Sequence, residues 1–198
     1  MTYIVASIGR SGSTLISKLI AEAKGLNIKY VSDISIENKD FLIKTHSHFR
    51  KEPEHEYRAI FIYGNIYDAI YSMMHGKVNL KKHLVHLEVK QSDRRIFWFL
   101  HFFSKTLAFK YIVKDDKLRF KENIVSWQKS KNTLFVDYDR LETEKKKVLE
   151  EISEFLNLQL SDFEFRKRES SGGKLSNNLK NMIDTEYEIF FESLNKKY

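Results

Sequence analysis

Short apolar runs alternate with helically spaced apolar positions along this chain. The runs predict strands at residues 3–8, 27–31, 41–46, 58–63 and 132–138. From residue 59 to 63 the run is continuous, which is typical of a strand buried on both faces of a sheet. Helical spacing follows the first, fourth and fifth of these strands.

The predicted helices rest on apolar residues that recur three or four positions apart. Leu15, Leu19 and Ile20 have this spacing directly after the first strand. Further helical stretches are predicted at residues 64–74, 77–117, 144–157 and 178–196, and another helix is expected to end within 124–129. A length of 198 residues suits one domain, so residues 1–198 are expected to form a single domain.

Composition narrows the class of protein. The net charge of +7 suits an anionic ligand, and equally a lysine-rich surface with no partner. The chain has no cysteine, which excludes disulfides and zinc–thiolate sites. No apolar run approaches the roughly 20 residues that span a membrane, and no signal peptide opens the chain. A cytoplasmic location and no membrane span are therefore expected.

The turn between the first strand and the first helix carries the most informative motif. Residues 9–14 read Gly-Arg-Ser-Gly-Ser-Thr. Glycines at positions 9 and 12 allow close backbone approach, and the free N–H groups at a helix start favour an anion. The lysine of the nucleotide-triphosphate loop, which directly follows its second glycine, is replaced by Ser13. An ordinary strand–helix turn is the alternative interpretation.

This motif resembles the phosphosulfate loop of sulfotransferases that use 3′-phosphoadenosine 5′-phosphosulfate (PAPS). The resemblance implies that the loop holds the 5′-phosphate and that Arg10 contacts the bridging oxygen as the sulfuryl group departs. The implied cofactor-binding residues of the loop are Gly9, Arg10, Ser11, Gly12, Ser13 and Thr14. The proline that usually opens the family loop is missing here.

The strand at residues 41–46 ends in Lys-Thr-His. Lys44 and His46 are two positions apart and so lie on one side of the strand. A histidine there can take a proton at neutral pH, and a lysine can stabilise developing negative charge. A strand end that meets solvent is the alternative. The segment resembles the K-x-H strand of cytosolic sulfotransferases, which implies His46 as general base and Lys44 at the sulfuryl group. His48 is a second, weaker candidate for the base.

The remaining resemblance concerns the nucleotide. Residues 58–74 are similar to the family block in which an arginine and a serine bind the 3′-phosphate. Ser72 matches that serine, but Gly64 stands at the arginine position. The resemblance also implies Tyr138 against the adenine and a late basic loop at the 3′-phosphate. In that loop the candidates are Arg166, Lys167, Arg168 and Lys174.

Aromatic residues crowd the stretch 96–103. Packing in the core is the favoured interpretation, and a wall of the acceptor pocket is the alternative. His83 and His86 are three positions apart, but no further ligand has a convincing spacing, so no metal site is expected.

Taken together, the resemblance implies an α/β fold: a P-loop-containing three-layer sandwich with a mainly parallel sheet flanked by helices. It implies a sulfotransferase that moves a sulfuryl group from PAPS to a hydroxyl or amine of a small molecule or glycan, without a metal and with no nucleic-acid partner. A non-catalytic sulfotransferase-like module that binds an anion or nucleotide is one alternative. A P-loop small-molecule kinase is another, which the missing lysine disfavours.

Overall fold

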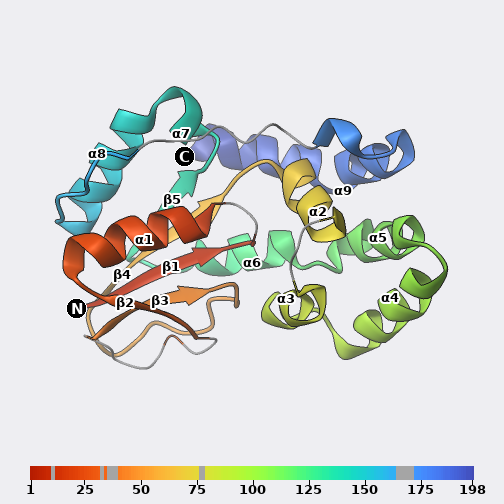
Figure 1. Cartoon of the computed structure of the whole chain (residues 1–198), viewed down its shortest axis with the longest axis horizontal. Coiled ribbons are helices and arrows are strands. Elements are labelled where there is room, and N and C mark those ends of the chain that lie inside the picture. Colours follow the sequence, from red (N-terminus) through yellow and green to blue (C-terminus); the bar gives the residue numbers. More distant parts are fainter. Residues whose placement is uncertain (10–11, 32–33, 35–39, 76–78, 164–171) are drawn as a thin grey trace.

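The computed structural model describes residues 1–9, 12–31, 34, 40–75, 79–163 and 172–198. Within these residues, five parallel strands form one sheet in the order β2-β3-β1-β4-β5 (Figure 1). The strands are β1 (Thr2–Ser7), β2 (Asn27–Tyr30), β3 (Phe41–Thr45), β4 (Tyr57–Tyr63) and β5 (Thr133–Asp137). The expected α/β fold with a mainly parallel sheet is confirmed, and every strand pair described is parallel.

The central strand β1 is buried along its whole length. Its side chains alternate between two cores, with Ile4 and Ala6 on one face and Tyr3 and Val5 on the other. The register pairs Val5 with Lys44 of β3 and with Ile60 of β4. A strand held from both sides and both faces is a rigid base for the residues that follow it.

Helices cover both faces of this sheet (Figure 1). Apolar residues of α1, α7 and α8 pack on one face, and those of α2, α6 and α9 contribute to the core on the other face together with α3, α4 and α5. Their bounds are α1 (Ser13–Lys24), α2 (Ile66–His75), α3 (Leu80–His86), α4 (Gln91–Phe103), α5 (Lys105–Val113), α6 (Phe120–Trp127), α7 (Arg140–Thr143), α8 (Lys145–Leu156) and α9 (Asn177–Lys197), with 3₁₀ turns η1 (Lys114–Asp116) and η2 (Gly172–Lys174). None of the helices in the described ranges is both long and apolar enough to cross a membrane.

The strand order creates a crevice at the end of β1. The chain leaves β1 toward α1 on one face of the sheet. In the sheet, β1 lies between β3 and β4, which are on its two opposite sides. In open parallel sheets, ligands bind at the carboxyl ends of strands where the order reverses in this way. Figure 1 shows these ends facing the part of the molecule that holds α2 and α3.

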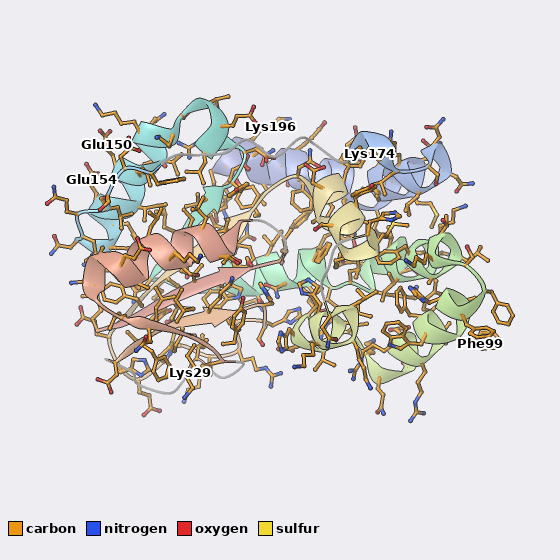
Figure 2. The ribbon with its side chains drawn as sticks, in the orientation of Figure 1. Lys29, Phe99, Glu150, Glu154, Lys174 and Lys196 are labelled. Atoms are coloured by element: carbon orange, nitrogen blue, oxygen red, sulfur yellow. The ribbon has the colours of Figure 1, made fainter. Side chains whose placement is uncertain are left out.

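The aromatic run in α4 is mostly outside the core, so the favoured interpretation of residues 96–103 is wrong. Only Phe97 of the run's phenylalanines is fully buried, while Phe99 is 65% exposed and Phe102 is 85% exposed. Figure 2 shows Phe99 at the outer edge of the molecule, pointing away from it. The apolar residues surround the helix, and the helix offers only one side to the core.

Candidate active site

The loop after β1 leads into α1 through two left-handed glycines. Gly9 has φ +86° and Gly12 has φ +79°. At Gly12 the space is also closed, because a Cβ there would lie 1.8 Å from Cε2 of Tyr138. Gly12 is the N-cap of α1 and has no side chain to satisfy the first N–H groups of the helix. The loop therefore offers backbone donors and the positive end of a helix dipole.

Lys44 reaches from β3 to the first turn of α1. Its side chain is 2% exposed, and Nζ donates a 2.6 Å hydrogen bond to Oγ1 of Thr14. The ammonium also lies over the ring of Tyr30, 5.0 Å from its centroid. A positive charge is thus held at the entrance to α1, next to the uncapped N–H groups.

His46 lies just beyond β3 and is fixed by the end of β1. Its Nδ1 lies 3.0 Å from the carbonyl oxygen of Ser7 and 2.9 Å from Oγ of Ser7. A carbonyl oxygen only accepts hydrogen bonds, so Nδ1 carries the hydrogen and Nε2 has the lone pair. Burial, aided by the neighbouring His83 and Lys44, lowers the pKa of His46 from 6.5 to about 3. The imidazole is therefore neutral at neutral pH, with the lone pair on Nε2.

Helix α3 places two more imidazoles beside this residue. The ring of His83 meets that of His46 edge to face, with centroids 5.4 Å apart. It also lies against the loop, because a Cβ on Gly9 would come within 2.6 Å of it. One turn further on, the ring of His86 lies nearly parallel to that of Tyr30, with centroids 6.4 Å apart. Helix α3 therefore closes the crevice opposite the end of β3.

One cavity of about 300 Å³ joins the loop to these side chains. A second cavity, of about 400 Å³, adjoins the first. The first is lined by Gly12, Ser13, Thr14, Leu15, Tyr30, Lys44, His46, Asn79, Lys82, His83, His86 and Tyr138. The second is lined by Tyr30, Val31, Lys44, Thr45, His46, Ser47, Arg50, Val85, His86 and Glu88. Tyr30, Lys44, His46 and His86 border both. A group bound in one cavity can thus meet a group bound in the other at His46.

Comparison with known proteins gives a family for this chain. A model of the sulfotransferase domain matches residues 28–184, which is more than three-quarters of the 198 residues. The chain belongs to the sulfotransferase domain family. The match begins downstream of the glycine loop, so the family assignment does not depend on that loop. A search of curated protein sequences found no match.

Two solved structures are similar in fold to this sulfotransferase-domain chain. One is mouse sulfotransferase SULT7A1 complexed with PAP, with a TM-score of 0.54, 20% identity, and coverage of 81% of this chain and 60% of that one. The other is retinol dehydratase in complex with androsterone and the inactive cofactor PAP, with a TM-score of 0.51, 12% identity, and coverage of 92% and 63%. The chain thus spans about three-fifths of the length of these two proteins.

Several site residues predicted from the sequence of this sulfotransferase-domain protein lie together. The first cavity is lined by Gly12, Ser13, Thr14, Lys44, His46 and Tyr138, and Gly9 contacts its wall at His83. Arg10 and Ser11 lie outside the described residues, as do Arg166, Lys167 and Arg168. The residues assigned to the phosphosulfate loop and to the Lys-Thr-His strand are therefore neighbours wherever the structure describes them.

The weaker base candidate, His48, is not part of this group. It is buried, and its Nδ1 lies 3.3 Å from Oε2 of Glu88. Burial and the nearby Arg119 lower its pKa. Since it lines neither cavity, its contacts are those of a structural residue.

The described residues around the expected 3′-phosphate contacts include fewer cations than the family pattern suggests, and Arg166, Lys167 and Arg168 lie outside the described ranges. Ser72 lies in α2 and lines neither cavity. A Cβ on Gly64 would lie 3.8 Å from Oδ1 of Asp139. Burial, followed by the charges of Asp137 and Asp68, raises the pKa of Asp139 to about 6. Of the basic candidates, Lys174 is described; it lies in η2, which packs against α2 (Figure 2).

Four further residues shape the site and were not predicted in this role from the sequence: Ser7, Tyr30, His83 and His86. Tyr30 ends β2 at the same edge of the sheet as His46, so the strand-end rule alone would have found it. The two histidines were considered only as metal ligands. Among the described residues, no group of three histidine, cysteine or acidic side chains has the geometry to hold a metal.

Proposed function

We propose that this protein transfers a sulfuryl group from PAPS to a hydroxyl or amine acceptor. One observation carries the proposal: a neutral His46, oriented by Ser7, lies beside the buried Lys44. Lys44 in turn is bonded to Thr14, at the end of the glycine loop. A base, a fixed cation and an anion-binding helix start are the parts that in-line sulfuryl transfer needs.

In the proposed reaction, His46 takes the proton of the acceptor on Nε2. Its Nδ1–H stays hydrogen-bonded to the carbonyl oxygen of Ser7, which orients the ring and stabilises the imidazolium that forms. The acceptor oxygen or nitrogen forms a bond to sulfur, and the bond from sulfur to the phosphate oxygen breaks. Lys44 offsets negative charge on the oxygens around the transferred group.

The donor fits the first cavity by its chemistry. A 5′-phosphosulfate is an anion, and the cavity offers the start of α1, the Thr14 hydroxyl and the Lys44 ammonium. Tyr138 forms part of the same wall and is proposed to lie against the adenine. Ser72 and the basic loop with Arg166, Lys167 and Arg168 are proposed for the 3′-phosphate.

The similar structures support this choice of nucleotide. Both were solved with PAP, the product that PAPS leaves after transfer, and retinol dehydratase also holds androsterone. At 20% and 12% identity these two structures support the fold, and the assignment of the nucleotide to this chain is our proposal. A small-molecule acceptor in the second cavity is consistent with a cavity of about 400 Å³.

Calorimetric titration with PAP, 5′-AMP and ATP tests the proposal first, and a transfer assay with sulfur-labelled PAPS follows. We expect micromolar binding of PAP, clearly tighter than that of 5′-AMP, and labelled product that disappears in His46→Asn. PAP bound no more tightly than 5′-AMP would remove the support for a PAPS-dependent enzyme. Full turnover by His46→Asn would remove His46 as the base.

A non-catalytic nucleotide-binding module is the second candidate. Two features favour it: Gly64 replaces the family arginine, and the neighbouring Asp139 is a carboxyl group with a raised pKa. In that case PAP would bind, yet none of the phenols tested as acceptors would give labelled product.

A further inference from the structure

The second cavity has a distinct charge pattern. Glu88 is the single acid among the described residues that line it, while Lys44 and Arg50 bring two positive charges. The loop residues at the start of α1 and Tyr138 border the first cavity and are not part of this lining. If the donor occupies the first cavity, as proposed above, Arg50 and Glu88 belong to the acceptor side.

The carboxylate of Glu88 is already neutralised by protein groups. Its Oε2 lies 3.1 Å from Nη2 of Arg50 and 3.8 Å from Nη1 of Arg119. Its Oε1 accepts a 3.3 Å hydrogen bond from the backbone N–H of His48. Arg119 is itself paired with Glu122, so Arg50 is the main partner of Glu88. The charged side chains in the described lining are Lys44, Arg50 and Glu88, and their sum is positive.

Of the two cations in the described lining of the second cavity, Arg50 is the more accessible to a ligand. Its side chain is 77% exposed, and it donates one hydrogen bond to Glu88 from Nη2. A guanidinium carries five N–H donors in a planar fork that fits carboxylate, sulfate and phosphate groups. Glu88 therefore orients the guanidinium at the cavity wall, and most of its donors are left for another anion. Lys44, by contrast, is buried and bonded to Thr14.

We propose that the acceptor is an anionic hydroxyl compound whose carboxylate, sulfate or phosphate group binds Arg50 while its hydroxyl lies at His46. This inference rests on the proposed function and refines its acceptor class. A cationic amine would enter a positively charged cavity and meet like charges on Lys44 and Arg50, so amines are expected to be poor acceptors.

The test uses three phenols of nearly equal shape and different charge: 4-hydroxyphenylacetate (negative), 4-hydroxyphenylacetamide (neutral) and tyramine (positive). For the wild-type protein we expect kcat/KM to fall at least tenfold from the first to the second, and further for tyramine. 4-Hydroxybenzenesulfonate, added to the panel, distinguishes preference for a carboxylate from preference for a sulfate-type anion.

The variant Arg50→Gln should remove the preference for the anion, so that kcat/KM falls at least tenfold more for 4-hydroxyphenylacetate than for the neutral phenol. Lys51→Gln is the matched control: it removes the same charge from the next residue, which is 78% exposed, pairs with Glu54 and does not line the cavity. It should keep the preference. An equal loss for the charged and the neutral phenol in Arg50→Gln would indicate a structural role and overturn the proposal.

Direct binding gives a readout that does not need turnover. Calorimetry on the PAP-loaded protein should give a Kd for 4-hydroxyphenylacetate at least tenfold lower in the wild type than in Arg50→Gln. PAP itself should bind both proteins equally. If PAP binds and neither turnover nor binding distinguishes the charges, the acceptor inference is wrong and the sulfotransferase proposal stands. If PAP does not bind at all, the proposed function fails first.

Discussion

Lys44 in β3 and Thr14 in α1 are joined by a 2.6 Å hydrogen bond from Nζ to Oγ1. This bond ties the two sequence blocks of the candidate site together across the edge between β1 and β3. The ammonium is also buried, and burying a charge is costly unless another group compensates for it. An anionic group bound beside Lys44, as in the proposed function, would compensate for this cost.

Replacing Lys44 by Met should therefore separate activity from stability. We expect kcat for sulfuryl transfer to fall by about 100- to 1,000-fold, as for the loss of one preorganised donor at a reacting group. The free energy of unfolding should stay the same or rise, because a buried ammonium is replaced by an apolar chain of similar length. Lys18→Met, at an exposed position of α1, is the control and should change neither quantity.

His46 should make the folded protein sensitive to acid. The unfolded chain protonates this residue near pH 6.5 and the folded protein only near pH 3, so the unfolded state binds more protons between these values. The free energy of unfolding therefore decreases as the pH falls below 6.5. The loss that comes from His46 reaches about 3 kcal/mol at pH 4.5. Urea unfolding at pH 7.5 and 4.5 should show this additional loss in the wild type and not in His46→Asn. Identical losses in both would contradict the buried, neutral imidazole.

Gly12 should tolerate no side chain. Gly12→Ala introduces a Cβ 1.8 Å from Cε2 of Tyr138, at a left-handed position. Gly25→Ala is a matched control, because Gly25 has φ +64° and nothing within 4 Å of its Cβ position. We expect the control to cost about 1 kcal/mol from the backbone alone and Gly12→Ala clearly more. Adding Tyr138→Ala to Gly12→Ala should recover the difference, and strict additivity of the two changes would refute the contact.

Gly64→Arg should restore the family contact to a 3′-phosphate. An arginine there would face the carboxylate of Asp139 and lie in the region proposed for that phosphate. Calorimetry should show PAP binding about 10- to 150-fold tighter, since a charge-assisted hydrogen bond contributes about 1.5–3 kcal/mol. The affinity for 5′-AMP should not change. Gly64→Ala controls for the added Cβ, which would lie 3.2 Å from Cβ of Tyr138. A parallel change for PAP and 5′-AMP would place the 3′-phosphate elsewhere.

The two sides of α4 should respond very differently to truncation. Phe97→Ala removes a fully buried ring and should destabilise the protein by about 3–5 kcal/mol in urea unfolding. Phe102→Ala, at a position 85% exposed, should stay within about 0.5 kcal/mol of the wild type. Equal effects would mean that both rings are packed in the folded protein.

Local patterns allowed most of the fold to be predicted. All five strands lie within a residue or two of the predicted runs. For β1, β3 and β4 the reason is that a strand buried on both faces is largely apolar. The Lys-Thr-His end of β3 could be placed for a different reason: the carboxyl ends of parallel strands meet at one edge of the sheet. The contacts of Lys44 with Thr14 follow from that shared edge.

What could not be predicted depends on how distant helices pack. His83 meets His46 only because α3 crosses the crevice, and nothing in the 36 residues between them encodes that crossing. In α4 the sequence is apolar on all sides, so the periodicity does not tell which ring is buried. The pairing of Arg50 with Glu88 across the second cavity is likewise a product of tertiary structure.

The contact between Gly12 and Tyr138 has a consequence for the newly made protein. Gly12 leaves the ribosome 126 residues ahead of Tyr138, a delay of roughly 6–25 s at 5–20 residues per second. Until then β5 is missing, and the ring that covers the loop is not yet in place. The nascent chain therefore cannot complete the first cavity until Tyr138 has been synthesised, and a ligand of that cavity can begin to stabilise the fold only after that point.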